Sequence, residues 1–471
     1  MTRGARPPVR HPDGSPATNP APCPASVRLP ALLRLPDDDR HALRWLIGSG
    51  LLCLAIFLAT VPLPRADGHL IGSDGFAYYA IVRSVALDHD FDFADDYTLL
   101  GFGHGPRPST ARVPGNPFAI GTAILWLPFF LVAHAVALGL VTLGMQTSTD
   151  GVGYLYEGAV CCGTIFYASV GFVLAYRTAR RLFEVRAALA ATLAMWWATG
   201  AIYYIVAEPS MSHAPTIFSE ALFLWLWYPP DRSRTLVQWF VLGLAVALVA
   251  LVRWQEGLIV LAPAAELLLA RRARKSPADL LARAVVFAAG VAFGFLPQIA
   301  MWSAVYGKPL TIPQGNDFIQ WLQPHPWQML FSSRHGLMSW HPIFLLATLG
   351  LPSLWRRDRA LALVVGAMFV AQLYVNSAVG YWWADDAFGA RRFNGLVPLF
   401  TLALAALLAA TTRRARWSTW LAILLALVLW NGLSFAQYRL GFVSMNAALT
   451  FRQMTIDRLL LPWRLLRRWR P

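Results

Sequence analysis

Long apolar runs separated by short polar connections dominate the chain from residue 43 onward. A helix needs about 20 mostly apolar residues to cross the hydrocarbon core of a bilayer, and the longer runs reach this length. The pattern therefore predicts an all-α polytopic integral membrane protein with about 11–13 transmembrane helices. The runs fall near residues 43–64, 118–145, 154–176, 187–206, 214–228, 236–252, 254–270, 283–303, 336–354, 360–378, 396–411 and 417–435.

The same pattern divides the chain into three parts. Residues 1–42 are rich in proline, alanine and arginine and lack periodicity, which predicts a disordered cytoplasmic tail. The transmembrane domain is expected over 43–435, with a first outer loop at 65–117. Residues 436–471 mix arginine with leucine and tryptophan, which predicts an interfacial amphipathic tail in contact with membrane lipids. The acidic run Asp37–Asp39 is interpreted as the start of the first helix and not as a metal site.

Charge sets the expected orientation. Hydrophobic residues make up 57% of the chain and charged residues 14%, whereas soluble domains carry about 25% charge. The net charge is +15, and nearly all of the basic residues are arginines in clusters between apolar runs. The positive-inside rule places such clusters in the cytoplasm, so this excess does not indicate a nucleic-acid partner. The opposite face is then shared by four connections, which are residues 65–117, 207–213, 304–335 and 379–395.

One pair of runs conflicts with this topology. If the arginine cluster at 177–186 faces the cytoplasm, the runs at 118–145 and 154–176 cannot both cross as single helices. Pro128 lies within the first run, where proline removes a backbone hydrogen bond and bends a helix. We therefore expect 118–145 to be broken or re-entrant, as is tolerated where protein covers the backbone.

The first outer loop contains the strongest candidate for chemistry. Seven of the 25 acidic residues lie between positions 67 and 96, and an ionisable residue at a membrane surface indicates a functional site. In Gly72–Gly75 the two glycines allow a tight turn and leave Asp74 free to project. Its carboxylate could take a proton from an acceptor hydroxyl, hold a divalent cation such as Mg²⁺ or Mn²⁺, or cap a short interfacial helix expected over 76–87.

The other outer connections add basic and polar candidates. Arg112 precedes a Pro/Gly-rich entry into an apolar run, and guanidinium groups suit phosphate oxygens as well as lipid headgroups. Glu208 and His213 are the ionisable residues of the second connection, although His213 could be a neutral hydrogen-bonding residue. The last connection places two acids and two arginines beside paired tryptophans. The catalytic candidates are Asp74, Glu208 and His213; the substrate- or phosphate-binding candidates are Tyr78, Tyr79, Arg112, Lys308, Arg334, His335, Asp385, Asp386, Arg391 and Arg392.

Three features in this order resemble a known family. An acidic first outer loop is followed by Arg112-x-Pro-Gly-Asn-Pro117 and by a Tyr203-Tyr…Pro-x-Met211 turn. The arrangement, from about residue 43 to 400, resembles the GT-C class of membrane glycosyltransferases. The closer likeness is to the branch of protein O-mannosyltransferases and the lipid A aminoarabinose transferase. Gly75 stands where that branch often has a second acid, and the second turn reads Glu208-Pro-Ser-Met, with its acid displaced.

The resemblance implies a function. Such enzymes take a sugar from a polyprenyl-phosphate carrier at the extracytoplasmic face and usually invert the anomeric centre. It implies an inner-membrane, multi-pass glycosyltransferase whose acceptor is a lipid, a polysaccharide or a protein. Asp74 matches the first-loop acid, which serves as base or metal ligand, and Arg112 matches the basic residue that would hold the carrier phosphate. No cofactor is implied beyond a divalent cation at Asp74.

A flippase or transporter of a lipid-linked or anionic substrate is the alternative. It would account for the helices and the arginines without any chemistry. Transporter sites usually lie near the middle of the membrane, whereas the ionisable residues of this chain gather in the connections of one face. This distribution favours the transferase.

Overall fold

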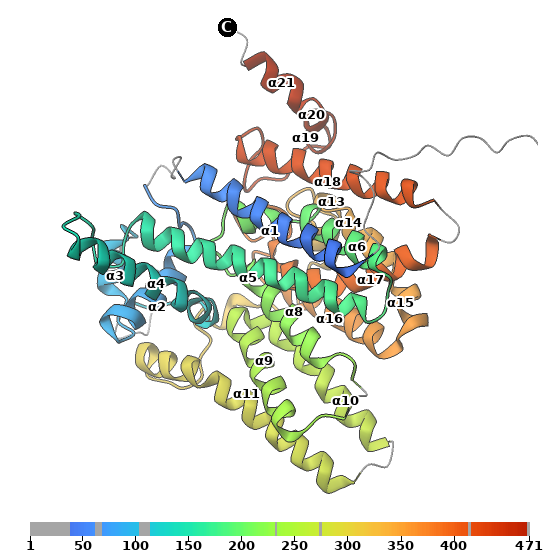
Figure 1. Ribbon diagram of the computed structural model, residues 1–471, viewed down its shortest axis with the longest axis horizontal. Helices are drawn as coiled ribbons and strands as arrows, with labels where there is room; N and C mark the ends of the chain where they lie inside the picture. The colour runs from blue at the N-terminus through green and yellow to red at the C-terminus, as the bar shows by residue number, and fades with distance from the viewer. Residues whose placement is uncertain are drawn as a thin grey trace, which may run out of the picture. The chain divides into compact units, whose positions relative to one another are not determined.

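The computed structural model describes residues 38–61, 68–102, 114–230, 233–272, 276–412 and 416–468. Residues 1–37, which make up most of the expected N-terminal tail, and Arg112 lie outside the described residues. Helices dominate the described part of the chain, where the only β-pairing is an isolated bridge between Ile319 and Val379. The expected all-α membrane fold is confirmed (Figure 1).

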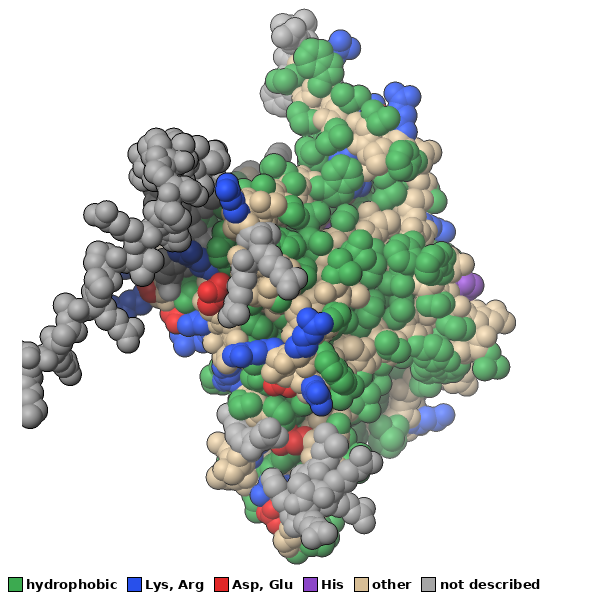
Figure 2. Space-filling view, turned by 90° about the vertical axis from the view of Figure 1, so that its right-hand side faces the viewer, with side chains coloured by type: hydrophobic (Ala, Val, Ile, Leu, Met, Phe, Trp, Pro, Cys, Tyr) green, Lys and Arg blue, Asp and Glu red, His purple; other side chains and the backbone are tan. Residues whose placement is uncertain are grey.

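Seven helices in the described ranges are long and apolar enough to cross a membrane. They are α1 (Asp39–Thr60), α4 (Gly121–Thr142), α5 (Tyr154–Arg180), α11 (Pro277–Tyr306), α16 (Arg359–Ser377), η5 with α17 (Arg391–Leu396 and Val397–Thr411) and α18 (Trp417–Arg439). The span at Arg391–Thr411 is central, with 83% of it buried, whereas α11 and α18 each bury only 17%. The exposed apolar side chains spread over much of the face in Figure 2, as expected of a surface in contact with lipid.

The remaining apolar runs form shorter helices. Those that follow α5 are α6 (Val185–Trp197), α7 (Ala201–Val206), α8 (Pro215–Trp227), α9 (Leu236–Val252), η3 (Trp254–Val260) and α10 (Leu261–Arg272). Those that follow α11 are η4 (Asn316–Phe318), α12 (Pro326–Phe331), α13 (Leu337–Trp340), α14 (Ile343–Leu349) and α15 (Leu351–Arg357). The chain ends in α19 (Phe451–Met454), α20 (Ile456–Leu459) and α21 (Leu461–Arg468). Several expected spans are thus split into two pieces.

The expectation that 118–145 is broken is wrong, whereas its re-entrant course stays a prediction. Helix α4 runs without interruption from Gly121 to Thr142 with Pro128 inside it. The missing N–H of a proline removes one bond from a long helical ladder. Trp126 and Phe130, on either side of Pro128, are fully buried, and α4 packs along α5. This packing holds the helix continuous.

The helix ends differ slightly from the expected domain limits. Helix α1 begins at Asp39, before the expected limit at 43, because Asp38 caps it by accepting a hydrogen bond from the His41 amide at 2.9 Å. This confirms that the acidic run starts a helix. Helix α18 continues to Arg439, past the expected limit at 435. Arg458 of the C-terminal segment is fully buried, with its guanidinium 4.7 Å from the ring centroid of Trp430 on α18.

Connections that carry arginines meet at one end of the helices. Arg180 at the end of α5 forms an ion pair with Asp39 at 2.8 Å. Tyr228 after α8 donates a hydrogen bond to Asp358 before α16 at 2.8 Å. These contacts join the start of α1 to the ends of α5 and α8, as the clustering of arginines in the sequence predicts.

The four expected outer connections meet at the other end. The first and second connections touch where the Gly72 amide donates to Ser210 Oγ at 3.3 Å. The third and fourth touch where His335 Nδ1 lies 2.7 Å from the Trp383 carbonyl oxygen. The shared location predicted from the spacing of the apolar runs is therefore confirmed, and the candidate site lies there.

The first outer loop folds into helix α2 (Gly75–Arg83), the π-turn η2 (Ser84–Asp88) and helix α3 (Ala94–Leu99). A helix after Asp74 was expected and is present, and every residue of α2 is buried within the protein. Its position along the membrane surface stays a prediction. Asn116 holds the helix in place by donating from Nδ2 to the Ala77 carbonyl at 2.7 Å. The Pro-Gly-Asn-Pro entry thus fixes the helix that carries the first-loop acid.

Candidate functional site

The carboxylate of Asp74 faces an arginine and not the helix that it precedes. Asp74 occupies the N-cap position of α2, but its side chain accepts no capping hydrogen bond. Instead Asp74 Oδ2 lies 3.5 Å from Nη1 of Arg391. The Asp74 side chain is 32% exposed and that of Arg391 is 12% exposed. The capping alternative therefore does not describe Asp74, and its carboxylate remains accessible.

A close approach of two turns fixes this carboxylate. A Cβ added at Gly75 would lie 2.5 Å from Ser210 Oγ and 2.9 Å from the Ser210 carbonyl oxygen. No side chain fits at that distance, so glycine is required by packing at this position. The strained backbone of the turn lies at Ser73, with φ of 52°. The first-loop acid is thus held against the second connection.

Three arginines from two elements converge beside Asp74. Arg391 and Arg392 open the 3₁₀ helix η5, and Arg253 lies between α9 and η3. Arg253, Arg391 and Arg392 lie close enough for their charges to interact. Arg392 is 9% exposed, and its buried Nη1 has no hydrogen-bond partner among the described residues. Like charges held together in this way need an anion to compensate them.

The second connection orients Arg253. Its Nη1 lies 3.0 Å from both Ser212 Oγ and His213 Nδ1. Tyr78 of α2 donates to the same Ser212 oxygen at 2.9 Å. Because a guanidinium only donates, Nδ1 of His213 must be the accepting nitrogen. Burial, and then the charges of the three arginines, lower the pKa of His213 well below its ordinary value. His213 is therefore a neutral acceptor that holds Arg253.

Hydroxyl groups complete the wall of the site. Burial raises the pKa of Tyr78 to about 12, so its hydroxyl keeps its proton at neutral pH. The hydroxyl of Tyr204 accepts a hydrogen bond from the Phe388 amide at 2.9 Å, and its ring lies 4.6 Å from that of His213. The Tyr381 ring lies 5.3 Å from the guanidinium of Arg392. The Tyr381 ring thus contacts Arg392 directly, and Tyr78 is linked to Arg253 through the Ser212 hydroxyl.

Several other predicted residues stand apart from this cluster. Tyr79 is fully buried and donates to the Gly151 carbonyl at 2.6 Å. Lys308 is exposed on the third connection. Arg334 donates to the carbonyl and side-chain oxygens of Asn446, both at 2.5 Å, and stacks on Trp383. These contacts are structural.

The remaining acids and His335 lie at the margin of the cluster. Glu208 is 8% exposed and accepts a hydrogen bond from Tyr203 at 3.5 Å. Asp385 and Asp386 are exposed, and Asp385 is near enough to Arg392 for their charges to interact. His335 is 2% exposed, and burial lowers its pKa to about 4. None of these four residues forms an ion pair with the three arginines in the described part of the chain.

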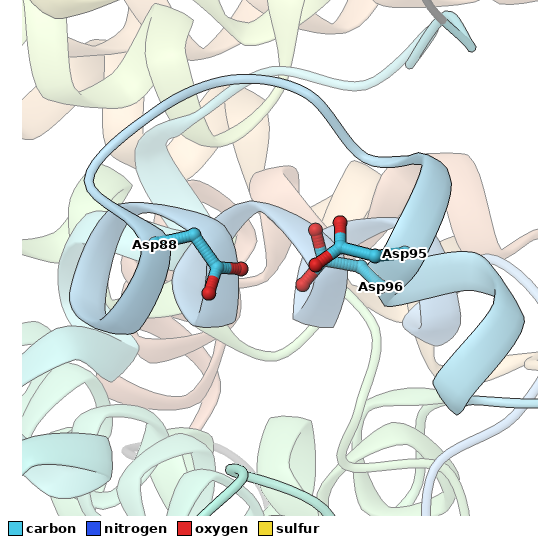
Figure 3. Close-up of side chains that lie close together, drawn as sticks. All are labelled: Asp88, Asp95 and Asp96. Carbon is cyan, nitrogen blue, oxygen red and sulfur yellow. The ribbon is translucent and has the colours of Figure 1, made fainter.

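The described residues around Asp74 do not form a cluster that would hold a divalent cation. Among the described side chains, no group of three metal-binding residues includes Asp74. A group of three carboxylates occurs elsewhere, at Asp88, Asp95 and Asp96 (Figure 3). Its centre is taken by Arg83, whose Nη1 lies 2.6 Å from Asp88, 2.7 Å from Asp96 and 3.8 Å from Asp95. The guanidinium supplies the positive charge there, so these acids support the loop.

Sequence reasoning missed Arg253. It is a single arginine between the apolar runs at 236–252 and 254–270, and only the clusters of arginine were weighed. The available signal was its isolation, because a lone ionisable residue within apolar sequence indicates function. Ser212 does not stand out in the sequence, because serine is common in turns. No sequence signal shows that its hydroxyl joins two elements of the site.

The arrangement can bind an anion beside a base. Guanidinium groups bind phosphate oxygens through charge-assisted hydrogen bonds. Asp74 lies next to them and is exposed enough to accept a proton from a hydroxyl group. The site can therefore hold a phosphate group while a nearby hydroxyl is activated.

Comparisons with known proteins show distant structural likeness only. No family model matches the chain, and no curated protein sequence matches it. ArnT from Cupriavidus metallidurans in the apo state superposes on 88% of this chain and 72% of its own, with 16% identity and a TM-score of 0.46. Its structure bound to undecaprenyl phosphate covers 92% of this chain and 73% of its own, with 16% identity and a TM-score of 0.45.

A third structure is the archaeal oligosaccharyltransferase AglB from Archaeoglobus fulgidus, in complex with an inhibitory peptide and a dolichol-phosphate. It covers 87% of this chain and 57% of its own, with 13% identity and a TM-score of 0.45. ArnT and AglB are GT-C glycosyltransferases, the class that the sequence motifs resemble. At this identity and superposition, the likeness carries no argument about activity, which must be argued from the site itself.

Proposed function

We propose that this chain is a membrane glycosyltransferase that moves a sugar from a polyprenyl-phosphate carrier to an acceptor hydroxyl. The observation that carries the proposal is the convergence of Arg253, Arg391 and Arg392 beside Asp74. The apolar helices provide the membrane setting for a lipid chain. The arginines provide a binding place for its phosphate.

The proposed reaction follows from these positions. The three guanidinium groups hold the carrier phosphate, and Asp74 accepts the proton of the acceptor hydroxyl. The acceptor oxygen forms a bond to the anomeric carbon as the bond from that carbon to the phosphate oxygen breaks. The electron pair of the broken bond stays on the phosphate, and attack from the opposite side inverts the anomeric centre.

The arginines favour the departing phosphate over the bound donor. A polyprenyl phosphate gains negative charge when the sugar leaves it. Fixed positive charges therefore interact more strongly with the leaving group than with the donor, and only such differential stabilisation accelerates a reaction. The buried Nη1 of Arg392 is one donor available for this purpose.

The face and the membrane belong to the same proposal. The connections that form the site lie at the end of the helices opposite the arginine-rich connections. By the positive-inside rule, the site faces the extracytoplasmic side of the inner cell membrane. An acceptor that is a lipid, a polysaccharide or a protein would meet the carrier there.

Purified protein in liposomes containing polyprenyl-phosphate sugars tests the proposal. Release of free polyprenyl phosphate by the wild-type protein and its loss in Asp74→Asn, with folding retained, would support a transferase with Asp74 at its centre. Equal release by both proteins would contradict the role of Asp74. Absence of release from every carrier, together with movement of a labelled lipid across the bilayer, would establish the flippase alternative.

A further inference from the structure

Two carboxyl groups outside the proposed reaction lie buried within the helices. Glu220 of α8 and Glu256 of η3 are both fully buried, and their carboxyl groups lie close enough to interact with each other. Gln372 of α16 donates from Nε2 to Glu256 Oε2 at 2.9 Å. Glu256 Oε1 and both carboxyl oxygens of Glu220 have no hydrogen-bond partner among the described residues.

Burial restricts the protonation states that such a pair of carboxyl groups can adopt. No described arginine, lysine or histidine forms a direct ion pair with Glu220 or Glu256, although Arg253 lies close enough for its charge to act on Glu256. An ionised carboxylate without a partner is costly to bury, and two in contact also repel each other. A single proton shared between the two groups removes the repulsion and leaves one negative charge instead of two, because the protonated carboxyl donates a hydrogen bond to its ionised neighbour.

The position of Glu256 relates this pair to the arginines. The Glu256 amide donates to the Arg253 carbonyl at 3.1 Å, so the two residues belong to one turn. The Glu256 carboxyl group packs against Gly395 of η5, where an added Cβ would lie 2.3 Å from Glu256 Cδ. Helix η5 also carries Arg391 and Arg392. The carboxyl group thus fills the contact between the two arginine-bearing elements.

The pair is braced from two further sides. Helix η5 packs against α8, which supplies Glu220, and against α16, which supplies Gln372. Gln372 also donates to the Gln255 carbonyl at 2.7 Å and accepts from Asn376 Nδ2 at 2.9 Å. These contacts therefore fix both the orientation of the Glu256 side chain and its position between the helices.

We propose that Glu220 and Glu256 form a proton-sharing positioning pair that sets the distance between Arg253 and the Arg391–Arg392 segment. The inference rests on the proposed anion site. A shared proton limits the pair to one negative charge, so that it acts as a spacer without offsetting all three arginine charges. The pair touches no reacting atom, and it acts on affinity for the phosphate group through the positions of η3 and η5.

A size exchange at the contact tests the spacing. Gly395→Ala should weaken binding of a short-chain isoprenyl phosphate about tenfold or more, because the new methyl group displaces η5 from Glu256. Glu256→Asp shortens the opposing side chain by one methylene group. The double variant Gly395→Ala/Glu256→Asp should recover most of the lost affinity. If the affinity losses of the two single variants multiply in the double variant, the spacing role is wrong.

Exchange of both carboxyl groups for amides tests the shared proton. The double variant Glu220→Gln/Glu256→Gln keeps size and hydrogen bonding and removes one negative charge, so it should bind the isoprenyl phosphate at least as tightly as wild type. The infrared carbonyl stretch of a protonated carboxyl group should be present in wild type and reduced in this variant. A large loss of affinity in a folded double variant, or absence of the infrared band in wild type, would overturn proton sharing.

The same binding measurement separates this inference from the proposed function. Arg253→Gln serves as the reference variant, since it removes one of the anion-binding groups directly. If Arg253→Gln leaves affinity for isoprenyl phosphate and for inorganic phosphate unchanged, the anion site itself is wrong. If Arg253→Gln weakens binding while the variants of Glu220, Glu256 and Gly395 do not, only the positioning role is wrong.

Discussion

Asp74 Oδ2 lies 3.5 Å from Arg391 Nη1, which joins an acid of the first outer connection to an arginine of the last. Ion pairs at this distance on a surface contribute little to stability. This pair is only partly exposed, and it lies beside two further arginines. The role of this ion pair is therefore to hold opposite charges at the place where the sugar donor and its acceptor would meet.

Replacing Asp74 with asparagine should abolish transfer without weakening the binding of carrier. Loss of a general base costs about 10²- to 10⁴-fold in rate, while Arg391 is released to interact with phosphate. Release of polyprenyl phosphate and binding of isoprenyl phosphate should be measured on the same preparation. Asp279→Asn is the matched control, because Asp279 pairs with Arg283 on α11. Unchanged turnover in Asp74→Asn would contradict the prediction.

Arg253→Gln should raise the KM for donor and weaken inhibition by free polyprenyl phosphate. Hydrogen bonds to charged groups contribute about 1.5–3 kcal/mol, which corresponds to roughly 10- to 100-fold in affinity. The control is Arg283→Gln, which removes an arginine that pairs with Asp279 instead. Equal KM values for the Arg253 and Arg283 variants would remove Arg253 from the site.

Gly75→Ala should reduce activity much more than it reduces the yield of folded protein. The added methyl group meets Ser210 Oγ at 2.5 Å, which pushes the turn that carries Asp74 away from the second connection. Ser210→Gly in the same chain should restore part of the activity, although the carbonyl oxygen of Ser210 remains close. Initial rates of the single and double variants provide the measurement, and additive losses would contradict the expectation.

Stability should fall as pH is lowered from 6.5 toward 4. Burial lowers the pKa of His335 from 6.5 to about 4, so over this interval the unfolded chain binds a proton that the folded chain does not. The contribution of His335 is complete above pH 6.5, and about 3 kcal/mol of it is lost by pH 4. His213 adds a loss of the same sign. Thermal unfolding in detergent across this range should show a shallower decline for His335→Gln than for wild type.

Removal of divalent cations should not destabilise the first outer loop. Arg83 already bridges Asp88 and Asp96, so a chelator has no structural ion to extract there. Thermal unfolding with and without chelator should coincide for the wild-type protein. In Arg83→Gln the acids lose this partner, and stability should fall and then rise on addition of Mg²⁺. A chelator-induced loss in wild type would show that the loop depends on a cation.

The helices and the common location of the outer connections were predictable from local sequence. Apolar runs of membrane-crossing length form helices, because backbone groups in hydrocarbon must be paired within the segment. Asp74 and the pair Arg391–Arg392 could be singled out as ionisable groups in such a chain. The burial of α2 was not predictable, because burial depends on the segments that cover a helix and not on the spacing of apolar residues within it.

The continuity of helix α4 could not be predicted from the sequence for a similar reason. From the sequence alone, a proline within an apolar run is equally consistent with a bend in one continuous helix and with a break between two helices. The burial of the side chains around Pro128 distinguishes the two cases. This burial results from the packing of α4 against other helices.

What the sequence alone determined is where helices occur and which connections lie together at one membrane surface. Both follow from distances along the chain, since each crossing brings the chain to the opposite face. Only the tertiary structure decided that Arg253 joins Arg391 and Arg392, that Asp74 faces Arg391, and that Glu220 meets Glu256. Those contacts depend on lateral packing and on the rotation of each helix about its axis, which single apolar runs do not specify.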